Sequence, residues 1–493
     1  MPARLHSQRL AALPPDIARP TYDRDALHTG IVHLGVGAFH RAHQAVYTEA
    51  LLNAGASDWG ILGVSLRHPT VPDTLAAQDG LYTMVARDGA GARCQVVGAI
   101  HRMLYAGTDP GALVARLADP RVNVVSLTVT EKGYCHDPAS GELDPTHPDI
   151  IHDLAHPDTP RSAPGFLVAG LRARFRAGTA PFTVLCCDNL PHNGRLVARL
   201  VADLAHRLEP GLGSRITEQV AFPCTMVDRI VPATTDTDRS WLSDTLGLED
   251  AAAVFCEPFS QWVIEDRFSG PRPAWEEAGA QLVDDVAPFE TMKLRLLNGS
   301  HSTLAYLGYL AGFETISDTI NDPDFRRLIQ GLMAGELAPT LENPPDTDLA
   351  AYQTALLQRF ANPALRHRCW QIAMDGSQKL PQRLLAPARE RLQRGEPVEC
   401  IALGVAGWMR YVTGVDERGA SIDVRDPLAG RLAGRTRALR HDAVALAEAL
   451  LAERAVFGED LAWDENFRTA VETALESLIQ HGTRATVARY AGR

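Results

Sequence analysis

Residues 30–55 read GIVHLGVGAFHRAHQAVYTEALLNAG, and this stretch decides the fold of the first half of the chain. An apolar run from Ile31 to Leu34 leads into a turn with two glycines, and a helical pattern follows from about Ala42 to Leu52. A short buried strand, a glycine turn and a helix in this order are typical of the first unit of a dinucleotide-binding sheet. The stretch therefore predicts an α/β domain that begins here.

The glycine turn has the chemistry that a bound pyrophosphate requires. Glycines allow a tight turn and a close approach of the backbone, and the N-terminus of the following helix directs N–H groups at the phosphates. An arginine in that helix would add a charge-assisted bond. The expected cofactor contacts are Gly35, Gly37, Ala38, Phe39 and Arg41. The third glycine of G-x-G-x-x-G is replaced by His40, so an ordinary strand-to-helix turn explains the same residues.

The second expected strand, residues 59–66 (WGILGVSL), ends without the acidic residue that usually binds the adenosine ribose. Arg67, His68, Pro69 and Thr70 follow it, and the first acid is Asp73. Arg67 would stack on adenine or pair with a 2′-phosphate. The residues at this position leave the choice between NAD and NADP open.

Strands and helices alternate through the rest of this half. Alternation of this kind predicts a doubly wound, mainly parallel sheet with helices on both faces. Further strands are expected at residues 94–100, 122–130, 182–187, 222–232 and 256–268, and helices at 110–117, 165–176 and 194–208.

Two of these strands end in polar clusters. Glu131 and Lys132 follow the strand at 122–130, and Asp188, Asn189, His192 and Asn193 follow the strand at 182–187. Open parallel sheets bind ligands at the carboxyl ends of their strands, which indicates a functional role. Asp and Asn also favour turns. Both interpretations remain for Lys132 and Asn189, whereas the turn is favoured for His192 and Asn193.

A second informative stretch, residues 289–310, reads FETMKLRLLNGSHSTLAYLGYL. Its apolar residues predict a largely buried helix that also carries Lys293, Asn298 and His301. At about 100° per residue these three side chains fall within roughly 140° of one another. A lysine in this context is paired, reaches solvent along its stem or is functional. The alternative is a helix end, with a break at Asn298 and a hydrogen-bonded core histidine.

The sequence pattern changes after residue 285, from alternating strands and helices to long amphipathic runs. We expect two domains, a dinucleotide-binding, Rossmann-like domain at residues 1–285 and a mainly helical substrate domain at residues 286–493. Long amphipathic runs dominate the second half, at residues 324–337, 348–360, 383–393 and 442–457.

Composition excludes several classes of protein. The 493 residues carry a net charge of −12 without a long basic run, which argues against nucleic-acid binding. No stretch approaches 18 apolar residues, and the N-terminus lacks a secretory signal, so no membrane association is expected. The eight cysteines are scattered and form no CxxC pair, which predicts no disulfide framework, no metal site and a cytoplasmic location.

Seven segments together resemble the polyol-specific long-chain dehydrogenases, the mannitol dehydrogenase family. The resemblance runs from about residue 15 to about residue 430, and the Lys-x4-Asn-x2-His pattern of Lys293, Asn298 and His301 is specific to that family. It implies a zinc-independent NAD enzyme, NADP not excluded, with a site in the cleft between a Rossmann domain and a helical domain. The segments are GVGAFHRAHQA, SLTVTEKGYC, CDNLPHNG, FPCTMVDRIVP, EPFSQWVIED, MKLRLLNGSHS and AMDGSQKLPQR.

The resemblance also implies roles for individual residues. Oxidation of a secondary alcohol needs a base, a group that holds the oxygen and a positioned nicotinamide. Lys293 matches the family's general acid and base, and Glu290 on the same helical face would relay protons. Asn189 and Asn298 match the amides that hold the substrate oxygen. His301 and Asp228 match substrate-binding positions, although Asp228 beside Arg229 is also explained by a structural salt bridge.

Departures from the mannitol dehydrogenases indicate the substrate. The segment TEKGY replaces Glu-Gly-Gly-Tyr, and Arg295 and Gln371 replace a glycine and an arginine. These forms resemble the fructuronate reductases of the family, which interconvert fructuronate and mannonate. Such substrates carry a carboxylate, which favours Arg or Lys partners. The candidate partners are Lys132, Arg295, Arg368, Lys379 and Arg383, of which only Lys132 and Lys379 have an arguable place in the active site.

Two other functions remain. A mannitol 2-dehydrogenase, or another polyol dehydrogenase, would use the same Lys293 chemistry on a neutral substrate. A binding or regulatory protein could also be built on this scaffold, although the complete set of Lys293, Asn298, Asn189 and His301 argues against it. The expected partner is a small sugar acid or polyol, and the expected state is a monomer or weak oligomer.

Overall fold

The computed structural model describes residues 3–137 and 140–492, and the chain divides between Ala287 and Pro288 into two compact units. The first unit is built on a five-stranded sheet in the order β5-β2-β1-β6-β7, in which all neighbours are parallel. This is the doubly wound order, with a switch point between β1 and β6. The strands are β1 (Thr29–Leu34), β2 (Gly60–Ser65), β5 (Ile100–Tyr105), β6 (Val124–Leu127) and β7 (Thr183–Cys186).

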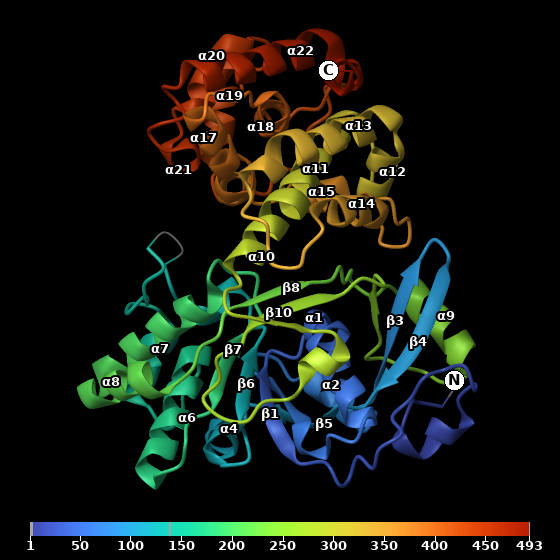
Figure 1. The fold of residues 1–493 in the computed structure, drawn as a ribbon, viewed down its shortest axis with the longest axis vertical. Coiled ribbons are helices and arrows are strands. Elements are labelled where there is room, and N and C mark those ends of the chain that lie inside the picture. Colours follow the sequence, from blue (N-terminus) through green and yellow to red (C-terminus); the bar gives the residue numbers. More distant parts are fainter. Residues whose placement is uncertain (1–2, 138–139, 493) are drawn as a thin grey trace. The chain divides into compact units, whose positions relative to one another are not determined.

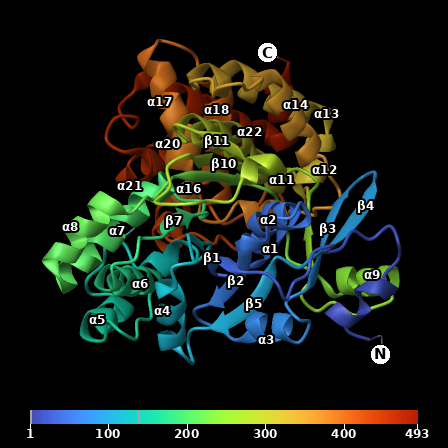
Figure 2. The same cartoon turned by 60° about the horizontal axis from the view of Figure 1, so that its bottom comes forward.

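Helices cover both faces of this sheet. Val32 and Leu34 of β1 pack into one core with α4, α6 and α7, whereas Ile31 packs into a second core with α1, α2 and α3. Alternate residues of one strand face opposite sides, which explains the near-continuous apolar runs. Figures 1 and 2 show α4, α6 and α7 gathered beside the β6–β7 end of the sheet. The helices are α1 (Ala38–Ala42), α2 (Gln44–Asn53), α3 (Thr70–Ala76), α4 (Pro110–Ala118), α5 (Pro148–Ala155), α6 (Ala163–Ala177), α7 (Asn193–Leu208), α8 (Pro210–Gln219) and α9 (Asp236–Leu246), with short 3-10 turns η1 (Ser7–Ala12), η2 (Ser57–Trp59), η3 (Glu131–Tyr134) and η4 (Trp275–Ala278).

Two small sheets complete the first unit. The strand expected at residues 94–100 is wrong, because these residues are divided between β4, in an antiparallel hairpin with β3, and the parallel strand β5. The expected strand at residues 256–268 likewise splits into two. Leu5, Leu13 and Ile17 pack into one core with Val85 of β3 and Val96 of β4, so the N-terminal segment contributes to the interior. The strands of these sheets are β3 (Tyr82–Asp88), β4 (Gly91–Val97) and β9 (Val254–Cys256), and β8 (Thr225–Asp228), β10 (Gln261–Glu265) and β11 (Gln281–Val283).

The second unit is helical, and its described residues contain no named strand. At the centre of this unit, helix α18 packs against both α11 and α22. Three π-helical segments interrupt the α-helices, and no helix among the described residues of the chain is long and apolar enough to cross a bilayer. The elements are α10 (Ala287–Met292), η5 (Lys293–Gly299), α11 (Ser300–Leu310), α12 (Ile316–Asn321), α13 (Pro323–Gly331), η6 (Leu332–Leu337), η7 (Ala338–Thr340), α14 (Leu349–Phe360), α15 (Cys369–Ile372), α16 (Gly376–Leu380), η8 (Pro381–Leu385), α17 (Ala386–Gln393), α18 (Glu399–Tyr411), α19 (Ala429–Thr436), α20 (Ala443–Leu451), α21 (Arg454–Phe457) and α22 (Glu465–Ala491).

Candidate active site

The glycine turn after β1 has the geometry that a dinucleotide requires. Gly35 has a φ of +96°, and a Cβ built on it would lie 2.2 Å from the carbonyl oxygen of Thr128. The backbone N–H of Gly37 donates to the oxygen of Gly35 at 2.7 Å, which closes the turn. A Cβ on Gly37 would meet only that same oxygen, at 3.9 Å, so the outer side of the turn is open to a ligand. These observations fit a bound pyrophosphate.

The missing third glycine is replaced by a pair of stacked imidazoles. His40 lies on His33 of β1 with ring centroids 3.3 Å apart and an interplanar angle of 12°. The two nitrogens of His33 are bonded to Ser126 Oγ at 2.8 Å and Thr128 Oγ1 at 2.9 Å. Burial lowers the pKa of His33 to about 3 and that of His40 well below its usual value, so both rings are neutral at pH 7. The flat pair achieves the close packing of helix on strand that a glycine usually permits.

The helix expected from about Ala42 to Leu52 is α2, and a separate short helix precedes it. Ala38, Phe39 and Arg41 lie in this short helix, α1, which His43 (φ −127°, ψ −92°) separates from α2. The bond expected from the Arg41 guanidinium to a phosphate stays a prediction, and the contacts of this group within the protein argue against it. That group is buried, donates to the carbonyl oxygens of Ala252 and Gly37, and lies 5.6 Å from the centre of the Tyr82 ring. Arg41 therefore ties the first helix to the domain interior.

The polar clusters after β6 and β7 are held together by one carboxylate. Asp188 accepts from the N–H groups of Val129 at 2.9 Å and Thr130 at 3.0 Å, and from the Tyr134 hydroxyl at 2.6 Å. Lys132 follows on one turn and Asn189 on the other, and both are exposed. The two turns that carry these candidate residues are thus fixed side by side at the carboxyl edge of the sheet.

Two other polar residues near this edge have structural contacts. Asn193 donates to the carbonyl oxygen of Asp188 at 3.0 Å and accepts from the N–H of Thr225 at 2.9 Å, while His192 is exposed at the start of α7. Asp228 is buried at the last position of β8, opposite Gln261. Its neighbour Arg229 donates to the carbonyl oxygens of Ala42 at 2.7 Å and Glu257 at 3.1 Å.

In the second unit, Lys293 and Asn298 lie at the start and near the end of the π-helix η5. A π-helix bonds residue i to residue i+5, so residues five positions apart lie on one face. The two side chains therefore align more closely than the roughly 140° spread expected for an α-helix. Both are buried, with 9% and 8% of their surface exposed. Glu290 lies half-buried one turn earlier, in α10.

His301 follows in α11 and is 7% exposed. Its ring stacks on Phe360 and His367, with centroids 5.3 Å and 5.6 Å away. Within the described part of the chain, its Nε2 is buried and has no hydrogen-bond partner. Burial, and then the charges of His367 and nearby basic residues, lower its pKa well below the usual value. A neutral imidazole with an unused nitrogen is suited to a substrate hydroxyl.

The π-helix η8 supports η5 through a close backbone contact. A Cβ on Gly299 would lie 2.9 Å from the carbonyl oxygen of Arg383, so only glycine fits without displacement. The Arg383 guanidinium donates to Ser302 Oγ at 3.1 Å and lies 3.5 Å from the backbone carbonyl oxygen of Asn298. Burial lowers the pKa of Arg383 to about 10. Arg383 thus holds the backbone beside Asn298.

Two further candidate partners of a substrate carboxylate, Lys379 and Arg295, differ in their contacts within the protein. Lys379 is half-buried, and its Nζ donates to the carbonyl oxygen of Met374 at 2.5 Å. Arg295 forms a two-pronged pair with Glu390, at 2.7 Å and 2.6 Å, and donates to the Thr340 oxygen at 2.7 Å. These three bonds within the helical unit argue against the predicted role of Arg295 as a carboxylate ligand, which stays a prediction.

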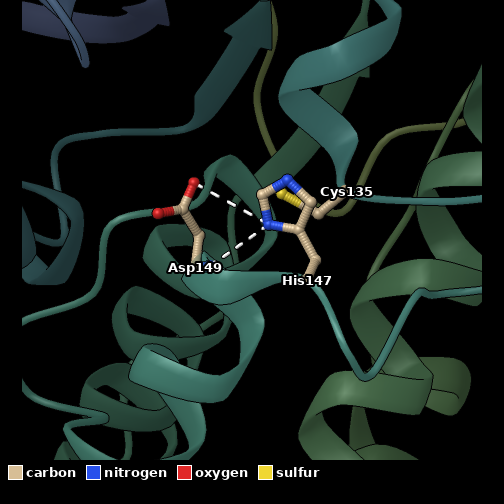
Figure 3. Close-up of side chains that lie close together, drawn as sticks. All are labelled: Cys135, His147 and Asp149. Carbon is tan, nitrogen blue, oxygen red and sulfur yellow. Dashed lines mark hydrogen bonds and ion pairs between the residues drawn. The ribbon is translucent and has the colours of Figure 1, made fainter.

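Cys135, His147 and Asp149 form a group that no sequence pattern indicated. One ligand atom of each lies within 4.8 Å of the others, which is compatible with a cation (Figure 3). Arg67 already pairs with the Asp149 carboxylate at 2.5 Å, and His147 Nδ1 accepts the Asp149 N–H at 3.2 Å. The absence of a metal site stays a prediction. No local signal could have shown the Arg67–Asp149 pair, because 82 positions separate the partners.

Comparisons with known proteins agree with these features. The family model "Mannitol dehydrogenase Rossmann domain" matches residues 29–277, and "Mannitol dehydrogenase C-terminal domain" matches residues 285–479. The chain is 51% identical to the uncharacterized oxidoreductase YeiQ of Escherichia coli, over 95% of this chain and 96% of that protein. It is 50% identical to the D-mannonate oxidoreductase of the same organism, over 96% of this chain and 98% of that protein. Among solved structures, the chain matches the Pseudomonas fluorescens mannitol 2-dehydrogenase in complex with NAD and D-mannitol. The TM-score is 0.88 and the identity 40%, and the match covers 99% of this chain and 100% of that protein.

Proposed function

Because the chain belongs to the mannitol dehydrogenase family, whose members are oxidoreductases that act on CH–OH groups, we propose that it is an NAD-dependent fructuronate reductase. It would interconvert fructuronate and D-mannonate. The 50% identity to a D-mannonate oxidoreductase, against 40% to a mannitol 2-dehydrogenase, supports the sugar acid.

One observation carries the reaction class. The π-helix η5 buries Lys293 and Asn298 on a single face, and a neutral His301 follows in the next turn. A buried ammonium beside amide and imidazole hydrogen-bonding groups is suited to a secondary alcohol and its ketone. This arrangement needs no metal to move the hydroxyl proton.

The cofactor supplies or accepts the hydride when it is bound, as NADH or NAD. During reduction the keto carbon gains a hydride, and the Lys293 ammonium donates a proton to the oxygen. During oxidation neutral Lys293 takes the hydroxyl proton while the hydride leaves. We assign the amides of Asn189 and Asn298 to the substrate oxygen, and Glu290 to proton exchange with solvent.

Further residues are assigned to the cofactor and to the rest of the substrate. Gly35 and Gly37, with the backbone of Ala38 and Phe39, would hold the pyrophosphate. His301 and Asp228 would bind substrate hydroxyls.

The carboxylate is assigned to Lys132 and Lys379. Lys132 is exposed on η3, which begins four residues after the end of β6, at the edge where parallel sheets bind ligands. Lys379 is half-buried at the end of α16, where its ammonium donates to the carbonyl oxygen of Met374 at 2.5 Å. A carboxylate that pairs with a lysine ammonium is held more strongly than the hydroxymethyl group of a neutral polyol.

The alternative is a mannitol 2-dehydrogenase, favoured by the full-length structural match to that enzyme. The substitutions Lys132→Met and Lys379→Met separate the two functions. A charged hydrogen bond contributes about 1.5–3 kcal/mol, so each should raise KM for fructuronate roughly tenfold to a hundredfold. Any reduction of fructose should change much less. Equal losses on both substrates would instead assign these lysines to structure or cofactor binding, and the sugar-acid function would fall.

A further inference from the structure

The carboxyl end of β2 has an arginine where most NAD-binding folds have an acid. Arg67 lies two residues past Ser65, the last residue of the strand. In this fold an acid at that place bonds the adenosine ribose, whereas an arginine accommodates the 2′-phosphate of NADP. The residue at this position is therefore compatible with NADP as well as NAD. The proposed function requires NAD, so another group must alter the effect of Arg67.

That group is the carboxylate of Asp149, in the first turn of α5. Arg67 Nη2 donates to Asp149 Oδ2 at 2.5 Å, and the Asp149 side chain is 14% exposed against 52% for Arg67. The Tyr105 hydroxyl also donates to the Arg67 carbonyl oxygen at 3.2 Å, which fixes the backbone. The backbone N–H of Asp149 in turn donates to His147 Nδ1 at 3.2 Å.

Cys135 and His147 lie beside the Asp149 carboxylate of this pair (Figure 3). His147 Nδ1 accepts the N–H of Asp149 at 3.2 Å and lies 3.9 Å from Asp149 Oδ2. The Arg67 guanidinium is thus paired directly with a carboxylate that the start of α5 holds in place.

We propose that Asp149 replaces the missing acid of β2 and, by occupying Arg67, selects NAD over NADP. A 2′-phosphate would have to break the Arg67 pair and approach the Asp149 carboxylate, which is a repulsive contact. A ribose 2′-hydroxyl can instead donate to that carboxylate. This inference rests on the proposed use of NAD.

The test measures binding of two adenosine fragments, 5′-AMP and 2′,5′-ADP, by isothermal titration in EDTA. The substitution Asp149→Asn removes the negative charge and keeps the shape. It should tighten 2′,5′-ADP about tenfold to a hundredfold, the range for a newly available charged hydrogen bond, and leave 5′-AMP within about threefold. The double variant with Arg67→Met should lose this gain. Steady-state kcat/KM with NADPH should likewise rise in Asp149→Asn and lose this gain in the double variant.

Asp158→Asn is the matched control, because Asp158 pairs with Arg172 at 2.6 Å elsewhere in the same unit. It should bind both fragments like the wild type, and the Tm of each variant shows that it is folded. An Asp149→Asn variant without tighter 2′,5′-ADP binding would overturn the inference, as would an equal gain in the double variant. Wild-type protein that binds 2′,5′-ADP more tightly than 5′-AMP would overturn it too. These titrations contain no sugar substrate. They therefore test the role of Asp149 even if fructuronate is not the substrate.

Discussion

Gly299→Ala tests the claim that close packing of two π-helices shapes the catalytic face. The added Cβ would lie 2.9 Å from the Arg383 carbonyl oxygen and 3.5 Å from side-chain carbons of Leu337 and Leu384. An ordinary contact begins near 3.4 Å, so η5 and η8 must separate by about 0.5 Å. Overpacking of this kind typically costs about 1–3 kcal/mol.

The matched control is Gly335→Ala, in the π-helix η6. Gly335 has no atom within 4 Å of a built Cβ, so it tests the effect of alanine without a clash. Alanine in a helix is about 0.5–1 kcal/mol better than glycine, so this variant should be slightly more stable than wild type.

The assay compares Tm and turnover of the two variants. At about 2–4 °C per kcal/mol for a unit of this size, Gly299→Ala should melt roughly 2–12 °C below Gly335→Ala. A shift of half an ångström at Asn298 should lower kcat about tenfold, whereas the control should keep wild-type turnover. Equal Tm and equal kcat in the two variants would refute the argument that Gly299 positions this face.

Three further outcomes are expected. Lys293→Ala should lower kcat roughly 10²–10⁴-fold with an unchanged Kd for NADH, and near wild-type turnover would remove Lys293 from its role. Arg295→Met should lower Tm by the loss of its bonds to Glu390 and Thr340 and leave KM for fructuronate unchanged; a rise in KM would restore Arg295 as a substrate ligand. Dialysis against EDTA should leave activity intact, whereas a loss that only Zn²⁺ restores would contradict the expectation that no metal takes part.

The architecture of the first unit could be predicted because its signals are local. The apolar runs of β1 and β2 and the Gly35 turn report burial on both faces and a tight backbone turn, and the structure confirms the doubly wound sheet. The hairpin of β3 and β4 was missed because the start of β4 is exposed and carries no apolar alternation. Its residues pair through the backbone, which the side-chain pattern does not record.

Parts of the site depend on contacts between distant residues. The π-helix η5 was not predicted, because a period of about 100° per residue assumes an α-helix. Arg295 was interpreted as a substrate ligand because a carboxylate substrate favours arginine partners, and the sequence could not show its pair with Glu390, which is 95 positions away. The Arg67–Asp149 pair was missed for the same reason.

The most direct test of the central claim is the ratio of kcat/KM for fructuronate to that for fructose, measured with NADH on the wild-type chain. A site with cationic partners for the carboxylate predicts a preference for fructuronate of about tenfold or more. Tagaturonate in parallel reports the stereochemistry. A ratio below one would contradict the account and assign the chain to the reduction of neutral ketoses.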